Sequence, residues 1–167
     1  ASFAAGSGTT TQTNKELSFN FPVSAMQFLP EWSKRQNNGE LGDYTGYNGA
    51  VLIQGGNNQG LPRYLLDSIG FKFNNNQRQE SQVAEYYTEL THERVPSYNH
   101  IYNYNFGINS PYADQPSGSA NFSRIDSVKA DLTCTVPGSG SVDVHVIATN
   151  YNVLSTSNGA AQLRFAS

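Results

Sequence analysis

Alternation of apolar and polar residues with a period of two is the feature that most constrains how this chain folds. It is clearest near the C-terminal end. The apolar positions of one segment are Val128, Ala130, Leu132, Cys134 and Val136, and those of the next are Val142, Val144, Val146 and Ala148. Successive side chains of a strand point to opposite faces, so each segment predicts a β-strand with one buried face. The turn sequence 137–140 between them predicts a hairpin.

The same alternation predicts strands earlier in the chain. It occurs at residues 17–23, where Pro22 indicates an edge strand, and again at 64–73 and 102–108. A short apolar run covers 50–53, and residues 24–48 show no regular pattern. In the segment 80–90 the apolar residues are three and four positions apart, which suits an amphipathic helix. A strand is an equally weighted alternative for this segment.

These patterns together predict an all-β chain with about eight short strands, which is typical of an antiparallel sandwich such as the eight-stranded jelly roll. Aromatic residues make up 12% of the 167 residues and charged residues only 14%, a balance that suits pleated sheets with large buried rings. The small, polar and aperiodic residues 1–13 are expected to form a linker or flexible segment, and 14–167 a single domain.

Charge and composition argue against several functions. The net charge is −3, and no basic run is longer than Lys34-Arg35, so nothing indicates contact with nucleic-acid phosphates. The single cysteine, Cys134, has no partner for an internal disulfide. No apolar run is long enough to cross a bilayer, so no transmembrane segment is expected.

No catalytic, cofactor or metal site is predicted, and we do not expect an enzyme. The histidines are His92, His100 and His145, and none is part of a zinc-binding pattern. His145 has the parity opposite to the valines around it and is expected to face outward. Cys134 has the parity of the apolar positions and is expected to be a small buried residue.

One feature leaves an alternative function open, and another matches a modification motif. Tyr102 and Tyr104 would suit a jelly-roll lectin if they stacked on sugar rings, although filling a core or a subunit interface is the simpler interpretation. Asn121-Phe122-Ser123 matches the acceptor pattern for N-glycosylation, which applies only to a chain that enters the secretory pathway.

The segment 115–126, QPSGSANFSRID, resembles a signature near the end of the second jelly roll in the major capsid proteins of nucleocytoplasmic large DNA viruses. Residues 150–154 are similar to the last strand of that family. The ending 158–165 looks closest to the African swine fever virus and faustovirus branch. The resemblance covers roughly residues 65–167.

This resemblance implies the C-terminal half of a double jelly-roll subunit. In the family, three such subunits form a trimeric capsomer of pseudo-hexagonal outline, and these capsomers tile an icosahedral shell over an internal membrane. The implied partners are other copies of the protein, its first jelly roll, and minor capsid and penton proteins. The implied location is the virion capsid, assembled in the host cytoplasm.

The signature residues have a structural interpretation and contain no catalytic set. They are Gln115, Pro116, Ser117, Gly118, Asn121, Phe122, Arg124 and Asp126. Pro116 and Gly118 suit a type I turn that starts a strand carrying Phe122 inward. Arg124 and Asp126 share the parity of Phe122. We therefore expect both to be partly buried and hydrogen-bonded near 115–118, unless a bulge turns them outward or they form an exposed ion pair.

Overall fold

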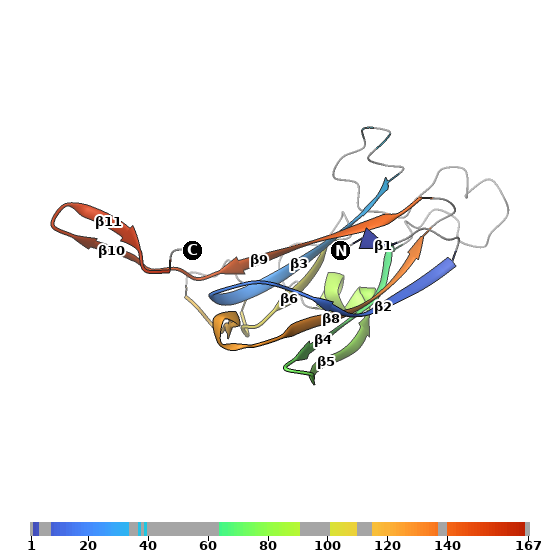
Figure 1. Ribbon diagram of the computed structural model, residues 1–167, viewed down its shortest axis with the longest axis horizontal. Helices are drawn as coiled ribbons and strands as arrows, with labels where there is room; N and C mark the ends of the chain where they lie inside the picture. The colour runs from blue at the N-terminus through green and yellow to red at the C-terminus, as the bar shows by residue number, and fades with distance from the viewer. Residues whose placement is uncertain are drawn as a thin grey trace.

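Two antiparallel β-sheets stack face to face in the computed structural model (Figure 1), which describes residues 2–3, 8–33, 37, 39, 64–90, 101–109, 115–136 and 140–165. The strands are β1 (Ser2–Phe3), β2 (Gly8–Glu16), β3 (Pro22–Trp32), β4 (Leu66–Phe73), β5 (Asn76–Val83), β6 (Tyr102–Asn105), β7 (Ala120–Asn121), β8 (Val128–Val136), β9 (Val142–Asn150), β10 (Leu154–Ser157) and β11 (Ala160–Leu163). Two short helical turns are η2 (Tyr86–Leu90) and η3 (Phe122–Arg124).

The strand order identifies the fold. Sheet A has the order β1-β9-β3-β6, with β7 also pairing with β3, and sheet B has the order β2-β8-β4-β5. When β1 to β6, β8 and β9 are counted one to eight along the chain, the sheets read 1-8-3-6 and 2-7-4-5. This interleaving is the eight-stranded jelly roll, so the predicted fold class is confirmed.

The core lies between the two sheets and is centred on an aromatic cluster. Phe71 on β4 of sheet B lies with its ring 5.5 Å from that of Phe28 on β3 and 4.8 Å from that of Tyr104 on β6, both in sheet A. The ring of Tyr87 in η2 packs edge-on against Phe71 at 6.4 Å, and its hydroxyl donates a hydrogen bond to the Ile69 carbonyl. Aromatic side chains from both sheets therefore fill the space that closes the sandwich.

The two most regular strands do not form the predicted hairpin. β8 pairs with β2 and β4 in sheet B, and β9 pairs with β1 and β3 in sheet A. The chain crosses from one sheet to the other between them. Their apolar faces both point into the core, which is the alternation that a hairpin would also show. Alternation therefore predicted the strands and their buried faces correctly but not their partners.

The predicted edge strand at 17–23 is also wrong. Residues 17–20 form no strand, although Leu17 and Phe19 pack on the core, and β3 begins only at Pro22. β3 continues to Trp32 through residues that were expected to be irregular, and it is a central strand between β9 and β6. Residues 23–26 of β3 are buried in succession, but from Met26 to Trp32 burial alternates, so the second half of the strand carries a period-two signal that the prediction missed.

The expected linker at 1–13 differs from the structure as well. β2 starts at Gly8 and pairs with β8 from Gly8↔Val136 onward, and β1 pairs with the start of β9. Residues 9–11 are all Thr, a β-branched residue that favours strands, and this preference outweighs their polarity. Sheet residues thus precede position 14.

The ambiguous segment 80–90 contains both predicted structures. Its first part completes β5, which pairs with β4 after the turn at Asn74 and Asn75, and its second part turns into η2. The predicted strands in 64–73 and 102–108 are confirmed as β4 and β6. The apolar run at 50–53 lies outside the described residues.

A small polar network stabilises a bulge in β2. The pairing of β2 with β8 shifts register between Gln12 and Lys15, and Asn14 has a left-handed φ of 55°. The Asn14 N–H donates to Asp131 Oδ1 at 2.7 Å, and Lys72 Nζ lies 2.6 Å from Asp131 Oδ2. Partial burial raises the pKa of Asp131, but the hydrogen bonds from Lys72 and Asn14 and the Lys72 charge outweigh it and hold the pKa below its ordinary value.

Replacing Phe71 with Ala should lower the free energy of unfolding by about 3–5 kcal/mol, because it removes a ring that contacts both sheets and leaves a cavity. Val83→Ala, at an exposed end of β5, is the control and should change it by less than about 0.5 kcal/mol. Urea denaturation of the variants measures both values. Equal losses in the two variants would contradict the central role of Phe71.

Asp131→Asn should reduce the acid sensitivity of folding. A carboxyl group whose pKa is lowered in the folded state stabilises the fold above its unfolded pKa of about 3.9, and this contribution is lost as the pH falls through the lower folded value. Urea unfolding from about pH 6 to about pH 3 should therefore show a smaller acid-induced loss in Asp131→Asn than in the unmodified protein. Asp126→Asn, at an exposed position, is the control. An unchanged pH profile in Asp131→Asn would exclude the network as a source of stability.

Candidate assembly surface

The signature segment joins the two sheets at one end of the sandwich. β7 pairs with the start of β3, and the Phe122 N–H donates to the Phe21 carbonyl at 3.1 Å. Phe122 is buried as predicted. Its ring packs edge-on against three others, those of Phe19, Phe73 and Phe106, at centroid distances of 6.1, 5.8 and 5.7 Å. The signature therefore anchors this end of the core.

Asn121 and Ser123, the polar residues of the glycosylation pattern, both support the local backbone. The Asn121 Oδ1 accepts a hydrogen bond from the Ser123 N–H at 3.1 Å and caps η3. The Ser123 Oγ accepts one from the Phe21 N–H at 2.8 Å, which holds Phe21 at a left-handed φ of 74°.

Two glycines allow the signature to approach the end of β6. A Cβ atom on Gly118 would lie 3.0 Å from Gly107 Cα, and one on Gly107 would overlap the Ser117 Oγ. The same Oγ accepts a hydrogen bond from the Asn109 N–H at 2.9 Å. This close backbone contact forms the corner.

Arg124 and Asp126 do not form this corner, and the prediction that they are partly buried is wrong. Both side chains are exposed. The turn η3 interrupts the strand after Phe122, so residue parity does not carry through from Phe122 to Val128. Ile125 packs against the core instead. The outward rotation left open as an alternative is the observed arrangement. Among the described residues, Ser117 and Gly118 contact Gly107 and Asn109.

The cysteine and two of the tyrosines in the described part of the chain are buried and have raised pKa values. Cys134 is fully buried as predicted, and burial, with a smaller effect of the nearby Asp67, raises the pKa of its thiol to about 12. Burial likewise raises the pKa values of Tyr87 and Tyr102 above the ordinary range. These groups stay neutral at physiological pH.

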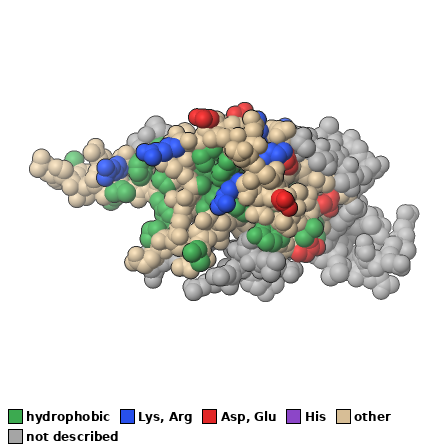
Figure 2. All heavy atoms as spheres, turned by 90° about the horizontal axis from the view of Figure 1, so that it is seen from below, with side chains coloured by type: hydrophobic (Ala, Val, Ile, Leu, Met, Phe, Trp, Pro, Cys, Tyr) green, Lys and Arg blue, Asp and Glu red, His purple; other side chains and the backbone are tan. Residues whose placement is uncertain are grey.

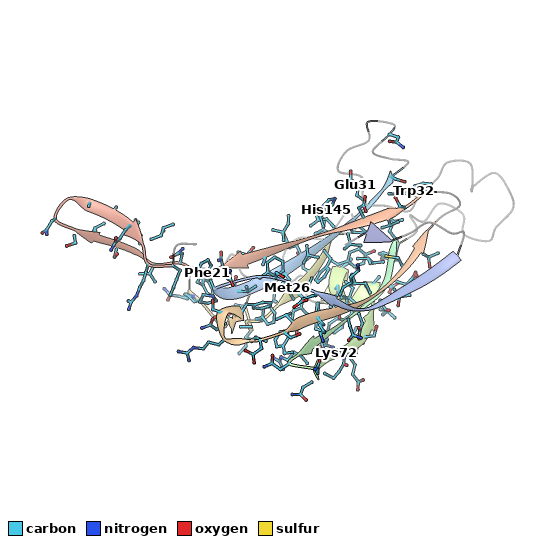
Figure 3. The ribbon with its side chains drawn as sticks, viewed as in Figure 1. Phe21, Met26, Glu31, Trp32, Lys72 and His145 are labelled. Carbon is cyan, nitrogen blue, oxygen red and sulfur yellow. The ribbon has the colours of Figure 1, made fainter. Side chains whose placement is uncertain are left out.

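His145 faces outward on sheet A as predicted and is 59% exposed. Its Nε2 lies 3.4 Å from the Glu31 carboxylate on the neighbouring strand (Figure 3), an ion pair when the ring is protonated. His92 and His100 lie outside the described residues. The described residues contain no group of three or more His, Cys, Asp or Glu side chains arranged to hold a metal ion.

The strands β10 and β11 form an arm that projects beyond the sandwich (Figure 1). Its turn has positive φ at both central residues, 51° at Asn158 and 80° at Gly159, as in a type I′ hairpin. The sequence analysis did not predict this hairpin, although an Asn-Gly pair between two short segments is a strong hairpin signal. None of its strands pairs with the two main sheets.

No helix among the described residues is long and apolar enough to cross a membrane.

Gly107→Ala should lower the melting temperature clearly, since the added methyl group forces apart the contact with Ser117 and Gly118, at a cost of about 1–3 kcal/mol. Arg124→Ala should change stability by less than about 0.5 kcal/mol, as expected for an exposed side chain. Differential scanning calorimetry of the two variants tests this contrast. A larger loss of stability in Arg124→Ala than in Gly107→Ala would contradict this expectation and support the partly buried position that the sequence predicted for Arg124.

The chain shares sequence with viral capsid proteins. Residues 3–162 match the family described as large eukaryotic DNA virus major capsid protein. The major capsid protein of Chrysochromulina ericina virus is 43% identical over 65 residues, which cover 37% of this chain and 11% of that protein. That of Phaeocystis pouchetii virus is 40% identical over 77 residues, covering 44% of this chain and 14% of that protein.

Solved structures show the same fold. PBCV-1 VP54, in a crystal structure fitted into a cryo-EM reconstruction of the virophage Sputnik, has a TM-score of 0.75 at 21% identity and covers 99% of this chain. A chain of the PBCV-1 virus capsid has a TM-score of 0.69 at 22% identity over 95% of this chain. The faustovirus major capsid protein has a TM-score of 0.53 at 14% identity over 84% of this chain.

This chain spans 49% of the VP54 chain and 46% of the PBCV-1 capsid chain. Its jelly-roll strand order agrees with that likeness, and the family match extends over nearly all of its residues. The chain belongs to the major capsid protein family of large eukaryotic DNA viruses.

Proposed function

We propose that this chain is a structural capsid protein and forms the C-terminal jelly roll of a double jelly-roll subunit. The family match over residues 3–162 carries the proposal. A span of about half of each PBCV-1 chain is the share that one of two jelly rolls would occupy. The signature at residues 115–126 supports the assignment to the second half, because it resembles the end of the second jelly roll in the family.

Three such subunits would form a trimeric capsomer with six jelly rolls and a pseudo-hexagonal outline. The partners are then other copies of the protein, its own first jelly roll, and minor capsid and penton proteins around each capsomer. The capsomers would form the shell of the virion, assembled in the host cytoplasm. The ending 158–165 further supports a relationship to the African swine fever virus and faustovirus branch.

A role as an enzyme or a nucleic-acid-binding protein has no support in the described residues. Cys134 is buried with a raised pKa, so it is a poor nucleophile. The lectin alternative loses its evidence as well, because Tyr102 and Tyr104 are both buried in the core and cannot stack on a sugar. We therefore propose a role in assembly.

Electron microscopy of the source particle tests the proposal. The map should contain this fold at symmetry-related positions of repeating pseudo-hexagonal units, with a second jelly roll beside each copy. Mass spectrometry of purified particles should find the protein at high copy number, because it is the main shell component. A single-copy protein, or one absent from the particle, would refute the proposed function.

A further inference from the structure

The arm and its base, residues 152–165, form a unit that is closed by its own hydrogen bonds. Asn152 Nδ2 donates to the Phe165 carbonyl at 2.7 Å, and Asn152 Oδ1 accepts from the Phe165 N–H at 3.1 Å. The Arg164 N–H donates to the Val153 carbonyl at 2.8 Å. Because these bonds join residues of the arm to one another, they close the hairpin without fixing its direction relative to the sandwich.

A backbone hydrogen bond and a ring contact connect this unit to the sandwich. The Tyr151 N–H donates to the Pro22 carbonyl at 2.9 Å, just past the end of β9. Beyond that point, the ring of Phe165 lies 6.1 Å from the ring of Phe21, with the two ring planes tilted by 36°. Figure 2 shows the arm as a narrow extension of the wider body, and Phe21 lies at the end of the sandwich from which the arm extends (Figure 3).

Phe21 has an unfavourable backbone conformation. Its φ of 74° lies in the left-handed region, which a bulky side chain rarely adopts, and a residue that precedes a proline, here Pro22, favours an extended conformation. The corner holds Phe21 in place, because its N–H donates to Ser123 Oγ at 2.8 Å and its carbonyl accepts from the Phe122 N–H at 3.1 Å. Such strain persists only where surrounding contacts impose it, and it is typical of clamps and switch regions.

The strained conformation directs the Phe21 ring toward the arm. Phe19, two residues earlier, packs on the core, and Val23, two residues later, belongs to it. The left-handed residue interrupts the chain between these two core residues, and its ring lies against Phe165. The contacts of the corner with the Phe21 backbone therefore also determine where the arm finds its ring partner.

We propose that Phe21 and Phe165 form an aromatic latch that sets the direction of the arm, and that Ser123 is the positioning residue of this latch. With the latch closed, the arm extends in one direction from the end of β9. With the latch open, the strain at Phe21 is released and the arm pivots at Tyr151 and Asn152, while the two sheets stay unchanged. A closed latch orders the arm before it meets a partner, which lowers the entropy cost of that contact.

Distances between two spin labels test the latch in the complete protein. The labels are attached at Ser157→Cys near the tip of the arm and at Glu80→Cys on β5, both exposed positions, while Cys134 is fully buried and stays unlabelled. Labelled copies are diluted with unlabelled copies, so that the measured distances lie within one chain. In double electron–electron resonance, adding Phe165→Ala should make the distance distribution about twice as wide, because the arm loses its ring contact. Phe165→Tyr keeps the ring and is the matched control, and equal widths in these two variants would overturn the latch.

The same measurement tests the positioning role of Ser123. Ser123→Ala removes the acceptor for the Phe21 N–H but leaves both rings in place, so the distance distribution should widen as it does in Phe165→Ala. Ser123→Thr supplies an Oγ acceptor again at this exposed position and should restore the narrow distribution. A residue that only stabilised the sandwich would lower the melting temperature without widening the distribution. Equal widths in the two Ser123 variants would refute the positioning role.

Trypsin provides a second measurement that needs no labels. The peptide bond between Arg164 and Phe165 lies beside the latch, and a protease cleaves such a bond only when the segment is released from its contacts. Phe21→Gly removes the partner ring, and glycine adopts a left-handed φ without strain, so this variant should fold and be cleaved after Arg164 about tenfold faster than the unmodified protein. Thermal unfolding checks that the sandwich is intact. An unchanged cleavage rate in folded Phe21→Gly would overturn the latch.

The latch consists of contacts within one chain, so it does not depend on the proposed capsid function. Absence of the protein from the particle would refute the capsid role and leave the distance distributions as expected. Equal distributions in Phe165→Ala and Phe165→Tyr, with the protein present in every capsomer, would overturn the latch alone.

Discussion

The contact between the facing sides of the two sheets, centred on Phe71, is the interaction on which the rest of the structure depends. Phe71 belongs to sheet B and packs on Phe28 and Tyr104 of sheet A, while η2 brings Tyr87 against its remaining side. Hydrogen bonds within each sheet do not hold the sheets together, so burial of these rings supplies most of the attraction between the layers.

The aromatic packing continues to the corner formed by the signature. Phe73 follows Phe71 on the same strand face and contacts Phe106 and Phe122. Phe122 ties the corner to the core, while Arg124 and Asp126 remain exposed because η3 interrupts the strand there. Within the signature, Phe122 and the close glycine contact at Gly118 shape the backbone.

A jelly roll stabilised from within leaves its outer surfaces available for contacts with other molecules. The outer face of sheet A carries a carboxylate pair, a half-exposed histidine and Ile147, and the arm extends from the end of β9. Because neither feature contributes to the core, both can vary or bind without cost to the fold. This separation suits a protein whose proposed role is to meet many copies of itself.

The sequence alone determined the fold class, the strands β4, β8 and β9, and the burial of Cys134 and Phe122, because period-two alternation reports which side of a strand avoids water. Only the tertiary structure decided that β8 and β9 belong to opposite sheets, since a buried face looks the same whichever strand lies beside it. It also revealed β3 as a central strand, in which residues 23–26 are buried without alternation and only the half from Met26 to Trp32 alternates. Arg124 and Asp126 were placed outward by a single helical turn, and a parity argument fails wherever the backbone leaves the extended conformation.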